Sequence, residues 1–401
     1  MNRMTGLGKS EGEVKSMKPR DRLLAAVAGK EVWPIPVDVM ENLIYPRLEA
    51  GLCQHFGLAE ADHEGVLFSL GAHTRWGKPL YIGPPLKEAP FQPPSAFPAR
   101  KATRSIWGSW AGMNTYTDEL ERPLSHVETV ADVDAHCWPN PDWFDYGRIG
   151  WNLDDADAFL PMAQWARRHA DYARIIGGFD PFFSRIMDLC GMEVGLILMT
   201  ARPDMVHAMV AHIGEFHEEY YGRIAEAARG HADFIAFGDD FAGQQGMLVR
   251  PEKWREYFLP LWRRLFDIVH RKSLKVVLHS CGAIRPVLGD LIDAGLDVFE
   301  VVQVTARGMD PAELKREFGA HLTFCGGMDT QHILPHGTLD DVRRQVRRLA
   351  DVFGVGGRYI LANMHLLMDD VPVENALAMY DEAHTYRADW ASLDLHSAGN
   401  H

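Results

Sequence analysis

A histidine and a cysteine, His279 and Cys281, stand two residues apart directly after the apolar run 275–278. Side chains at positions i and i+2 of a strand point to the same face, so both can reach one ion. Imidazole and thiolate are ligands that Zn²⁺ prefers, and the ion needs three or four of them. An isolated H-x-C pair is equally typical of a hydrogen-bonded histidine beside a buried thiol. The pair therefore predicts zinc only together with further ligands.

Further metal-capable side chains follow other short apolar runs. Asp239 and Asp240 come directly after the run 234–238. Adjacent carboxylates repel each other unless a cation or hydrogen-bond donors lie close. Capping of a helix N-terminus or pairing with an arginine is the alternative role. Cys325 and His365 also follow apolar runs. The further zinc ligands can come from these strand ends, through Asp239 or Asp240, Cys325 and His365.

Alternating strands and helices, most of them after about residue 155, must bring these residues together. The expected strands are 33–39, 173–179, 233–240, 275–282, 298–304, 322–329 and 358–365, and the helices between them include 202–229, 251–271, 284–294, 311–318 and 339–353. This alternation is typical of a parallel sheet with helical crossovers. Seven strands, with an eighth in the irregular region 75–151, predict an α/β fold of the (β/α)8 TIM barrel type; a doubly wound open sheet is the alternative.

The carboxyl ends of parallel strands carry the chemistry in both architectures. Besides the candidate zinc ligands, Asp38 and Gln303 stand at such ends. We predict catalytic roles for Asp240 and Asp38 and a substrate contact for Gln303.

Residues 75–151 lack the alternation of strands and helices and are rich in proline, glycine and aromatic residues. We expect an aromatic-rich N-terminal insertion that covers the active site, because insertions at the carboxyl end of barrel strands usually do so. Trp107, Trp110 and Trp151 are the candidates for substrate binding; the alternative is that they only pack the insertion against the barrel. The expected organisation is a flexible tail over 1–17 and a single barrel domain over 18–395.

Composition excludes several classes of protein. The formal net charge is −14, and no long basic stretch interrupts it, so nucleic acid and anionic membranes are not expected partners. The five cysteines are scattered without a CxxC pair, which is typical of a reducing compartment. No segment reaches the ~18 apolar residues of a membrane span. We predict a soluble, cytoplasmic protein; its oligomeric state is open, with a homodimer as one option.

Several short motifs follow one another along the chain: Gly238-Asp239-Asp240-Phe241-Ala242-Gly243, Arg250-Pro251, Leu278-His279-Ser280-Cys281-Gly282, Asp290-Leu291-Ile292 with Gly295 and Asp297, Val302-Gln303, Gly326-Gly327-Met328-Asp329 and Val371-Pro372-Val373-Glu374-Asn375. In this order they resemble the uroporphyrinogen decarboxylase superfamily. The resemblance covers about 160–385 well and 18–60 weakly, and it implies a (β/α)8 barrel.

The superfamily contains two chemistries, and the segment around Asp38 separates them. Porphyrinogen decarboxylases carry an arginine-rich motif there, whereas this chain has Val37-Asp38-Val39-Met40-Glu41-Asn42. Without arginines nothing in that segment can pair with several carboxylates, so we expect no decarboxylation of porphyrinogens. The resemblance therefore favours the zinc-dependent, cobamide-linked methyltransferases. In that branch the zinc ligands correspond to His279 and Cys281, an acidic ligand falls on or beside Asp239, and a last cysteine falls where this chain has His365. The resemblance therefore implies that His279, Cys281, His365 and Asp239 bind zinc, with Cys325 as the reserve ligand.

The resulting hypothesis is a zinc-dependent methyltransferase or demethylase. It moves a methyl group from a small O- or N-methyl compound, such as a methoxylated aromatic, to a cobamide or a thiol. The cobamide is either free or carried by a partner corrinoid protein. Zinc would polarise the leaving oxygen as a Lewis acid, or hold a thiol acceptor as its thiolate. The runner-up is a metal-independent decarboxylase or lyase that uses Asp38, Asp239 and Asp240, and a third reading is a non-enzymatic small-molecule or corrinoid-binding module.

Overall fold

The strands at the centre of the computed structural model close into a barrel. The structure describes residues 17–91, 100–111, 122–151, 158–179 and 181–390, so the predicted tail lies almost wholly outside the described residues. Seven parallel strands neighbour one another in the order β14 (Tyr359–Asn363), β13 (Thr323–Met328), β12 (Val298–Val301), β11 (Lys275–His279), β8 (Phe234–Gly238), β7 (Ala173–Phe179) and β1 (Thr74–Tyr81).

A short extended segment around Val37 closes the ring between β14 and β1. Val37 forms a parallel bridge with Leu361 of β14, and the Asp38 amide donates a hydrogen bond of 2.9 Å to the Leu361 carbonyl. On the other side, the His73 amide donates to the Val37 carbonyl at 3.1 Å, immediately before β1. The predicted (β/α)8 barrel is confirmed, and the eighth strand is β1, which begins at the edge of the irregular region.

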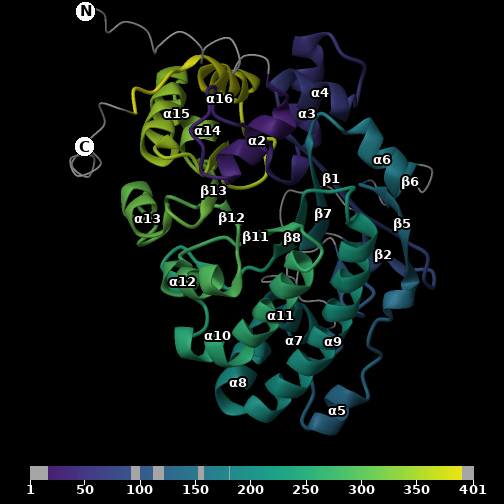
Figure 1. Cartoon of the computed structure of the whole chain (residues 1–401). Coiled ribbons are helices and arrows are strands. Elements are labelled where there is room, and N and C mark those ends of the chain that lie inside the picture. The colour runs from purple at the N-terminus through teal and green to yellow at the C-terminus, as the bar shows by residue number, and fades with distance from the viewer. Residues whose placement is uncertain (1–16, 92–99, 112–121, 152–157, 180, 391–401) are drawn as a thin grey trace, which may run out of the picture.

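Helices surround the strands, as Figure 1 shows. They are α2 (Pro19–Val27), α3 (Pro46–Phe56), α4 (His63–Leu70), α6 (Met162–Arg168), α7 (Phe183–Cys190), α8 (Met192–Ala201), α9 (Pro203–Ala228), α10 (Pro251–Tyr257), α11 (Leu259–His270), α12 (Arg285–Ala294), α13 (Pro311–Phe318), α14 (Ile333–His336), α15 (Leu339–Gly354) and α16 (Val373–Thr385). One expected helix was wrong in its continuity, because 251–271 breaks at Phe258 into α10 and α11. Pro260 follows the break, and proline cannot donate the amide hydrogen bond that a continuous helix requires there.

Two apolar layers hold the barrel together. Alternate residues of each strand point inward, so Val277 of β11 packs with Val298 and Ile360 inside the barrel, while its neighbours Val276 and Leu278 pack against the helices. Leu23 of α2 belongs to the inner cluster and closes the amino-terminal end of the strands. The opposite, carboxyl-terminal end is left for the polar residues of the strand ends.

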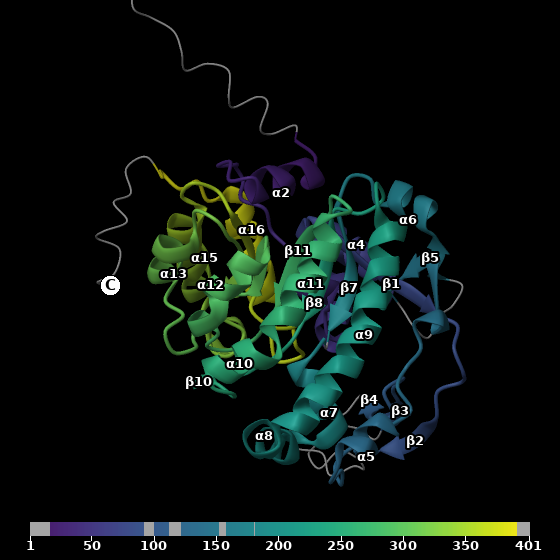
Figure 2. The same cartoon turned by 60° about the horizontal axis from the view of Figure 1, so that its bottom comes forward.

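The insertion forms separate small sheets. Strands β2 (Glu88–Phe91), β3 (Arg100–Arg104) and β4 (Trp110–Ala111) pair antiparallel, and β5 (Phe144–Gly150) pairs antiparallel with both β1 and β6 (Leu160–Pro161). Figure 2 shows the β2–β4 sheet beside the short helix α5 (Val130–Asp134), at the end of the molecule away from α2. The β2–β4 sheet therefore lies toward the carboxyl end of the barrel strands, whereas β5 runs alongside β1.

No described helix is by itself long and apolar enough to cross a membrane. The consecutive pair α8 and α9 passes a length and composition test together, but the two helices meet at an angle of 115°.

A buried histidine at the barrel seam predicts a pH dependence of stability. His73 is 2% exposed, and burial lowers the pKa of its ring to about 3. The unfolded chain takes up this proton below about pH 6.5, whereas the folded protein does not. Stability should therefore fall as the pH drops from about 6.5 to 3, by up to about 1.4 kcal/mol per pH unit. Urea unfolding midpoints of wild type and His73→Asn at several pH values test this. The midpoint of wild type should fall more steeply with decreasing pH than that of His73→Asn, because only wild type carries the buried histidine.

Candidate metal centre

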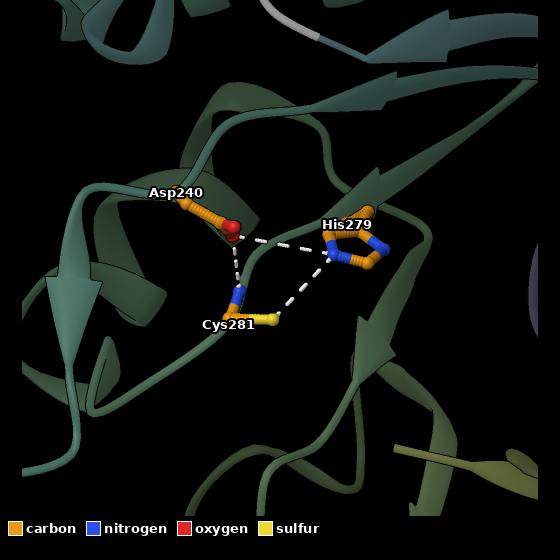
Figure 3. A group of neighbouring side chains, drawn as sticks. All are labelled: Asp240, His279 and Cys281. Atoms are coloured by element: carbon orange, nitrogen blue, oxygen red, sulfur yellow. Dashed lines mark hydrogen bonds and ion pairs between the residues drawn. The ribbon is translucent and has the colours of Figure 1, made fainter. Parts of the chain in front are cut away.

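Three side chains from two neighbouring strands converge at the carboxyl end of the barrel. His279 ends β11, Cys281 follows two residues later, and Asp240 follows β8. The His279 Nε2 lies 3.7 Å from the Cys281 Sγ and 4.0 Å from Asp240 Oδ1, and one ligand atom of each residue lies within 4.8 Å of the others. Figure 3 shows the three side chains pointing toward one another. The Cys281 amide also donates to Asp240 Oδ1 at 2.7 Å, which fixes the carboxylate.

The group fits a zinc ion in its chemistry and its spacing. A tetrahedral zinc with bonds of about 2.0–2.3 Å holds its ligand atoms about 3.4–3.6 Å apart, close to the 3.7 Å between Nε2 and Sγ. Burial, and then the carboxyl group of Asp240, raises the pKa of the Cys281 thiol well above its ordinary range. A bound cation would offset this penalty, because it favours the thiolate. His279, Cys281 and Asp240 are therefore the residues that would hold the metal.

Asp239, the predicted acidic ligand, points elsewhere. Its two carboxylate oxygens accept hydrogen bonds from the backbone amides of Phe183 at 3.0 Å and Ser184 at 2.7 Å, the first residues of α7. The side chain is fully buried, and burial raises its pKa to about 7. The structure therefore gives Asp239 the helix-capping role that was the alternative, and it brings Asp240 to His279 in its place.

His365 and Cys325 occupy different levels of the barrel. His365 follows β14 with an exposed side chain, and it lines the same cavity as Asp240 and Cys281 without joining their close group. Cys325 is buried deeper, among the inner apolar residues Val298 and Ile360. Burial raises the pKa of its thiol well above the ordinary value. His365 therefore lies at the cavity outside the close group, Cys325 is packed among the inner apolar residues, and their predicted roles as metal ligands stay predictions.

A cavity of about 530 Å³ opens beside the three converging side chains. Part of its wall is apolar and flexible, with Met192, Leu248, Met364 and Met368, and part is uncharged and polar, with Gln244, Gln303, Thr330 and Gln331. Its charged or titratable lining among the described residues is Asp240, Cys281 and His365, with no lysine or arginine. The cavity is therefore suited to a small, partly apolar ligand without a strong negative charge.

Gln303 holds the turn that carries the thiol. Its side-chain oxygen accepts a hydrogen bond of 2.7 Å from the Gly282 amide, directly after Cys281. Gly282 has a φ of 86°, and a Cβ there would lie 2.6 Å from the Ala242 carbonyl oxygen. Only glycine fits this left-handed, closely packed position. Gln303 thus lines the cavity and fixes the backbone of the H-x-C turn, and its predicted contact with a substrate stays a prediction.

Asp38 is buried and is not among the described residues that line the cavity. Its carboxylate accepts hydrogen bonds from the Thr74 hydroxyl at 2.6 Å and the Thr74 amide at 3.3 Å. Burial raises its pKa to about 7. These contacts hold Asp38 at the start of β1, and its predicted catalytic role stays a prediction.

Two acids that the sequence reasoning missed lie on the other side of His279. Its Nδ1 is 3.4 Å from Glu41 Oε1 and 4.0 Å from Glu300 Oε2. Glu300 carried a signal in the sequence, because an acid inside the apolar run of β12 is unusual unless it has a function. Glu41 lies in the short 3-10 turn η1 (Met40–Asn42), and the sequence around it shows no apolar pattern that would single it out.

The three candidate tryptophans are dispersed. Trp107 is 3% exposed, and its ring packs 4.9 Å from Phe216 and 5.4 Å from His217 of α9. Trp151 contacts Trp76 at 6.1 Å, beside the inner barrel cluster, and Trp110 pairs through its backbone with Arg104 of β3. None of the three is among the described residues that line the cavity. Trp107 and Trp151 therefore pack against neighbouring elements, and the substrate-binding role of the three tryptophans stays a prediction.

Replacement of Trp107 by alanine should mainly affect stability. The change removes a buried indole from between the insertion and α9, which costs about 3–5 kcal/mol. We expect a clearly lower unfolding temperature, with KM and kcat of the remaining folded protein near wild type. Thermal unfolding and steady-state kinetics on the same preparation check this. A normal unfolding temperature with a raised KM would instead support the predicted substrate contact.

Comparison with known proteins identifies the family. The family described as Uroporphyrinogen decarboxylase (URO-D) matches residues 154–386, which is more than half of the chain. The chain belongs to this family, and the predicted superfamily is confirmed.

Relatives named in these comparisons are methyltransferases. Two proteins described as "Methylcobamide:CoM methyltransferase MtaA", from Methanosarcina barkeri and its strain Fusaro, are each 25% identical over 214 residues. These matches cover 53% of this chain and 59% of each relative, so the chain spans little more than half their length. A solved "methyltransferase from Methanosarcina mazei" shares the fold, with a TM-score of 0.60, 17% identity, and coverage of 92% of this chain and 98% of that one.

Proposed function

We propose that the protein is a zinc-dependent, corrinoid-linked methyltransferase. It takes a methyl group from a small O- or N-methyl compound, such as a methoxylated aromatic, and passes it to a cobamide, either free or on a partner corrinoid protein; a thiol is the alternative acceptor. The observation that carries the proposal is the convergence of Asp240, His279 and Cys281 beside a cavity that Asp240 and Cys281 line. The relatives named MtaA support the reaction class.

Different residues of the site would bind the metal, exclude water and deliver a proton. Bound by His279, Cys281 and Asp240, zinc would supply Lewis-acid polarisation of the leaving heteroatom. The methionines and Leu248 of the cavity wall exclude water and accommodate the apolar part of the donor. When the methyl carbon–oxygen bond breaks, the oxygen keeps the electron pair and needs a proton to leave as an alcohol. His365 is the titratable side chain at the rim of the cavity that can deliver this proton.

The charge of the site favours a neutral donor. A neutral His279 with the thiolate of Cys281 and the carboxylate of Asp240 carries two negative charges, which Zn²⁺ balances. Because the described lining offers no lysine or arginine, an anionic group in the cavity would lack a counter-charge. Uncharged methoxyl compounds therefore suit the cavity better than carboxylated ones.

The described cysteines are all free, which supports a reducing, cytoplasmic location as part of the proposal.

A turnover experiment tests the proposal. Zinc-loaded protein is incubated with reduced cobalamin and a panel of methoxylated aromatics and methylated amines. We expect one donor class to yield its demethylated product and methylcobalamin in equal amounts, and a chelator to abolish both. Release of CO₂ from a methoxylated aromatic acid of the panel by chelator-treated protein, without methyl transfer, would instead support the metal-independent decarboxylase.

A further inference from the structure

The two nitrogens of the His279 ring face two different acidic groups. Nε2 faces Asp240 and Cys281, whereas Nδ1 faces Glu41 at 3.4 Å and Glu300 at 4.0 Å. The ligand-type atoms of Glu41, His279 and Glu300 all lie within 4.8 Å of one another. The imidazole therefore stands between the proposed metal site and a second pair of carboxyl groups that the proposed reaction does not use.

The segment that places the Glu41 carboxylate beside Nδ1 has a strained backbone. Glu41 and Asn42 have φ values of 51° and 53°, a left-handed conformation that non-glycine residues rarely adopt. Such residues cost of order 1–3 kcal/mol each and persist only where their surroundings hold them. Here the Met40 amide donates to the Asn363 side chain at 3.2 Å, and the Asn42 side chain donates to Thr74 Oγ1 at 3.3 Å. The loop is thus pinned on both sides with the Glu41 carboxylate beside the imidazole.

Strand register supplies the second acid. β11 and β12 pair in parallel with His279 opposite Glu300, so both side chains point into the barrel. Glu300 is 2% exposed and lies on the far side of Nδ1 from the metal group. It leaves Glu41 as the closer acceptor for a proton on Nδ1.

We infer that Glu41 is a positioning residue that accepts the Nδ1–H of His279 and so presents the Nε2 lone pair to the metal. A histidine that binds a metal through one nitrogen almost always donates from the other, and this contact fixes its tautomer and ring orientation. The inference rests on the zinc centre of the proposed function. It goes beyond that proposal because it assigns a role to the strained loop at residues 40–42.

Zinc affinity tests the inference without any turnover. The dissociation constant is measured by competition with a chromophoric chelator for wild type, Glu41→Gln, Glu41→Ala and the surface control Glu60→Ala. Because glutamine and alanine both keep a Cβ at the left-handed position, their difference reports the side chain and not the backbone. We expect Glu41→Ala to bind zinc about 10–100-fold more weakly. Glu41→Gln should recover part of this loss, because its amide oxygen still accepts the Nδ1–H, and Glu60→Ala should match wild type.

The absorption spectrum of the Co²⁺-substituted protein gives a second readout. A change in the ring orientation of His279 alters the ligand field, so the Glu41→Ala spectrum should differ from wild type while the Glu41→Gln spectrum stays closer to it. Equal zinc affinity and equal spectra in all four proteins would overturn the inference alone. If wild type binds no zinc, the proposed metal centre fails and the inference falls with it. Two zinc ions per wild-type chain, with one lost in Glu41→Ala, would overturn it in favour of a second metal site at Glu41, His279 and Glu300.

Discussion

Replacement of Cys281 by serine should leave the protein folded but without zinc, and it should reduce methyl transfer about a thousandfold. Cys281 is the only thiol in the group formed with Asp240 and His279 in the described part of the chain. A serine hydroxyl does not ionise near neutral pH, so the group loses its anionic sulfur ligand and the charge balance of the site. Loss of metal-based charge stabilisation worth several kcal/mol corresponds to about three powers of ten in rate.

Elemental analysis of protein purified without chelator measures the zinc content, and methyl transfer to cobalamin measures the rate. Two other cysteines provide matched controls. Cys137→Ser changes an exposed thiol, and Cys325→Ser changes the buried reserve candidate below the site. Both should keep about one zinc per chain. If Cys325→Ser loses the metal and Cys281→Ser keeps it, the metal lies deeper in the barrel than we propose.

The barrel was predictable because most of its strands are short apolar runs separated by amphipathic helices. The strand β1 was harder to recognise, since it contains a buried arginine. Arg75 is 3% exposed, pairs with Glu64 at 2.8 Å and lies 3.7 Å over the ring of Tyr172. These contacts stabilise the charge only in the folded protein, so the sequence pattern there resembles a loop.

The choice between the adjacent acids depended on which face of β8 points into the barrel. In β8, Phe234 and Ala236 face the barrel interior, while Ile235 and Phe237 face the helices. Continuing this alternation places Asp240 on the inner side and Asp239 on the helix side. The sequence alone does not show this, because a strand buried on both faces is apolar at every position. Glu41 was not predictable at all, since only the closed barrel brings its loop to His279.

Replacement of each adjacent acid by asparagine should therefore have opposite consequences. Asp239→Asn should destabilise the fold by about 2–4 kcal/mol, because one of the two amides at the start of α7 would face an NH₂ group where a carboxylate oxygen now accepts. Zinc binding by the folded fraction should change little. Urea unfolding of the metal-free protein and the zinc content after refolding measure the two effects separately.

Asp240→Asn should instead weaken zinc binding by at least about a hundredfold and leave the metal-free protein as stable as wild type. The asparagine oxygen can still accept the Cys281 amide, so the turn is kept, but the negative charge beside Nε2 is lost. Because burial raises the pKa of Asp240, removal of that charge relieves a cost in the metal-free protein. If Asp239→Asn loses zinc and Asp240→Asn loses stability, the two roles are reversed. The pair thus separates a residue that holds a helix from one that holds a metal, although the two are neighbours in the chain.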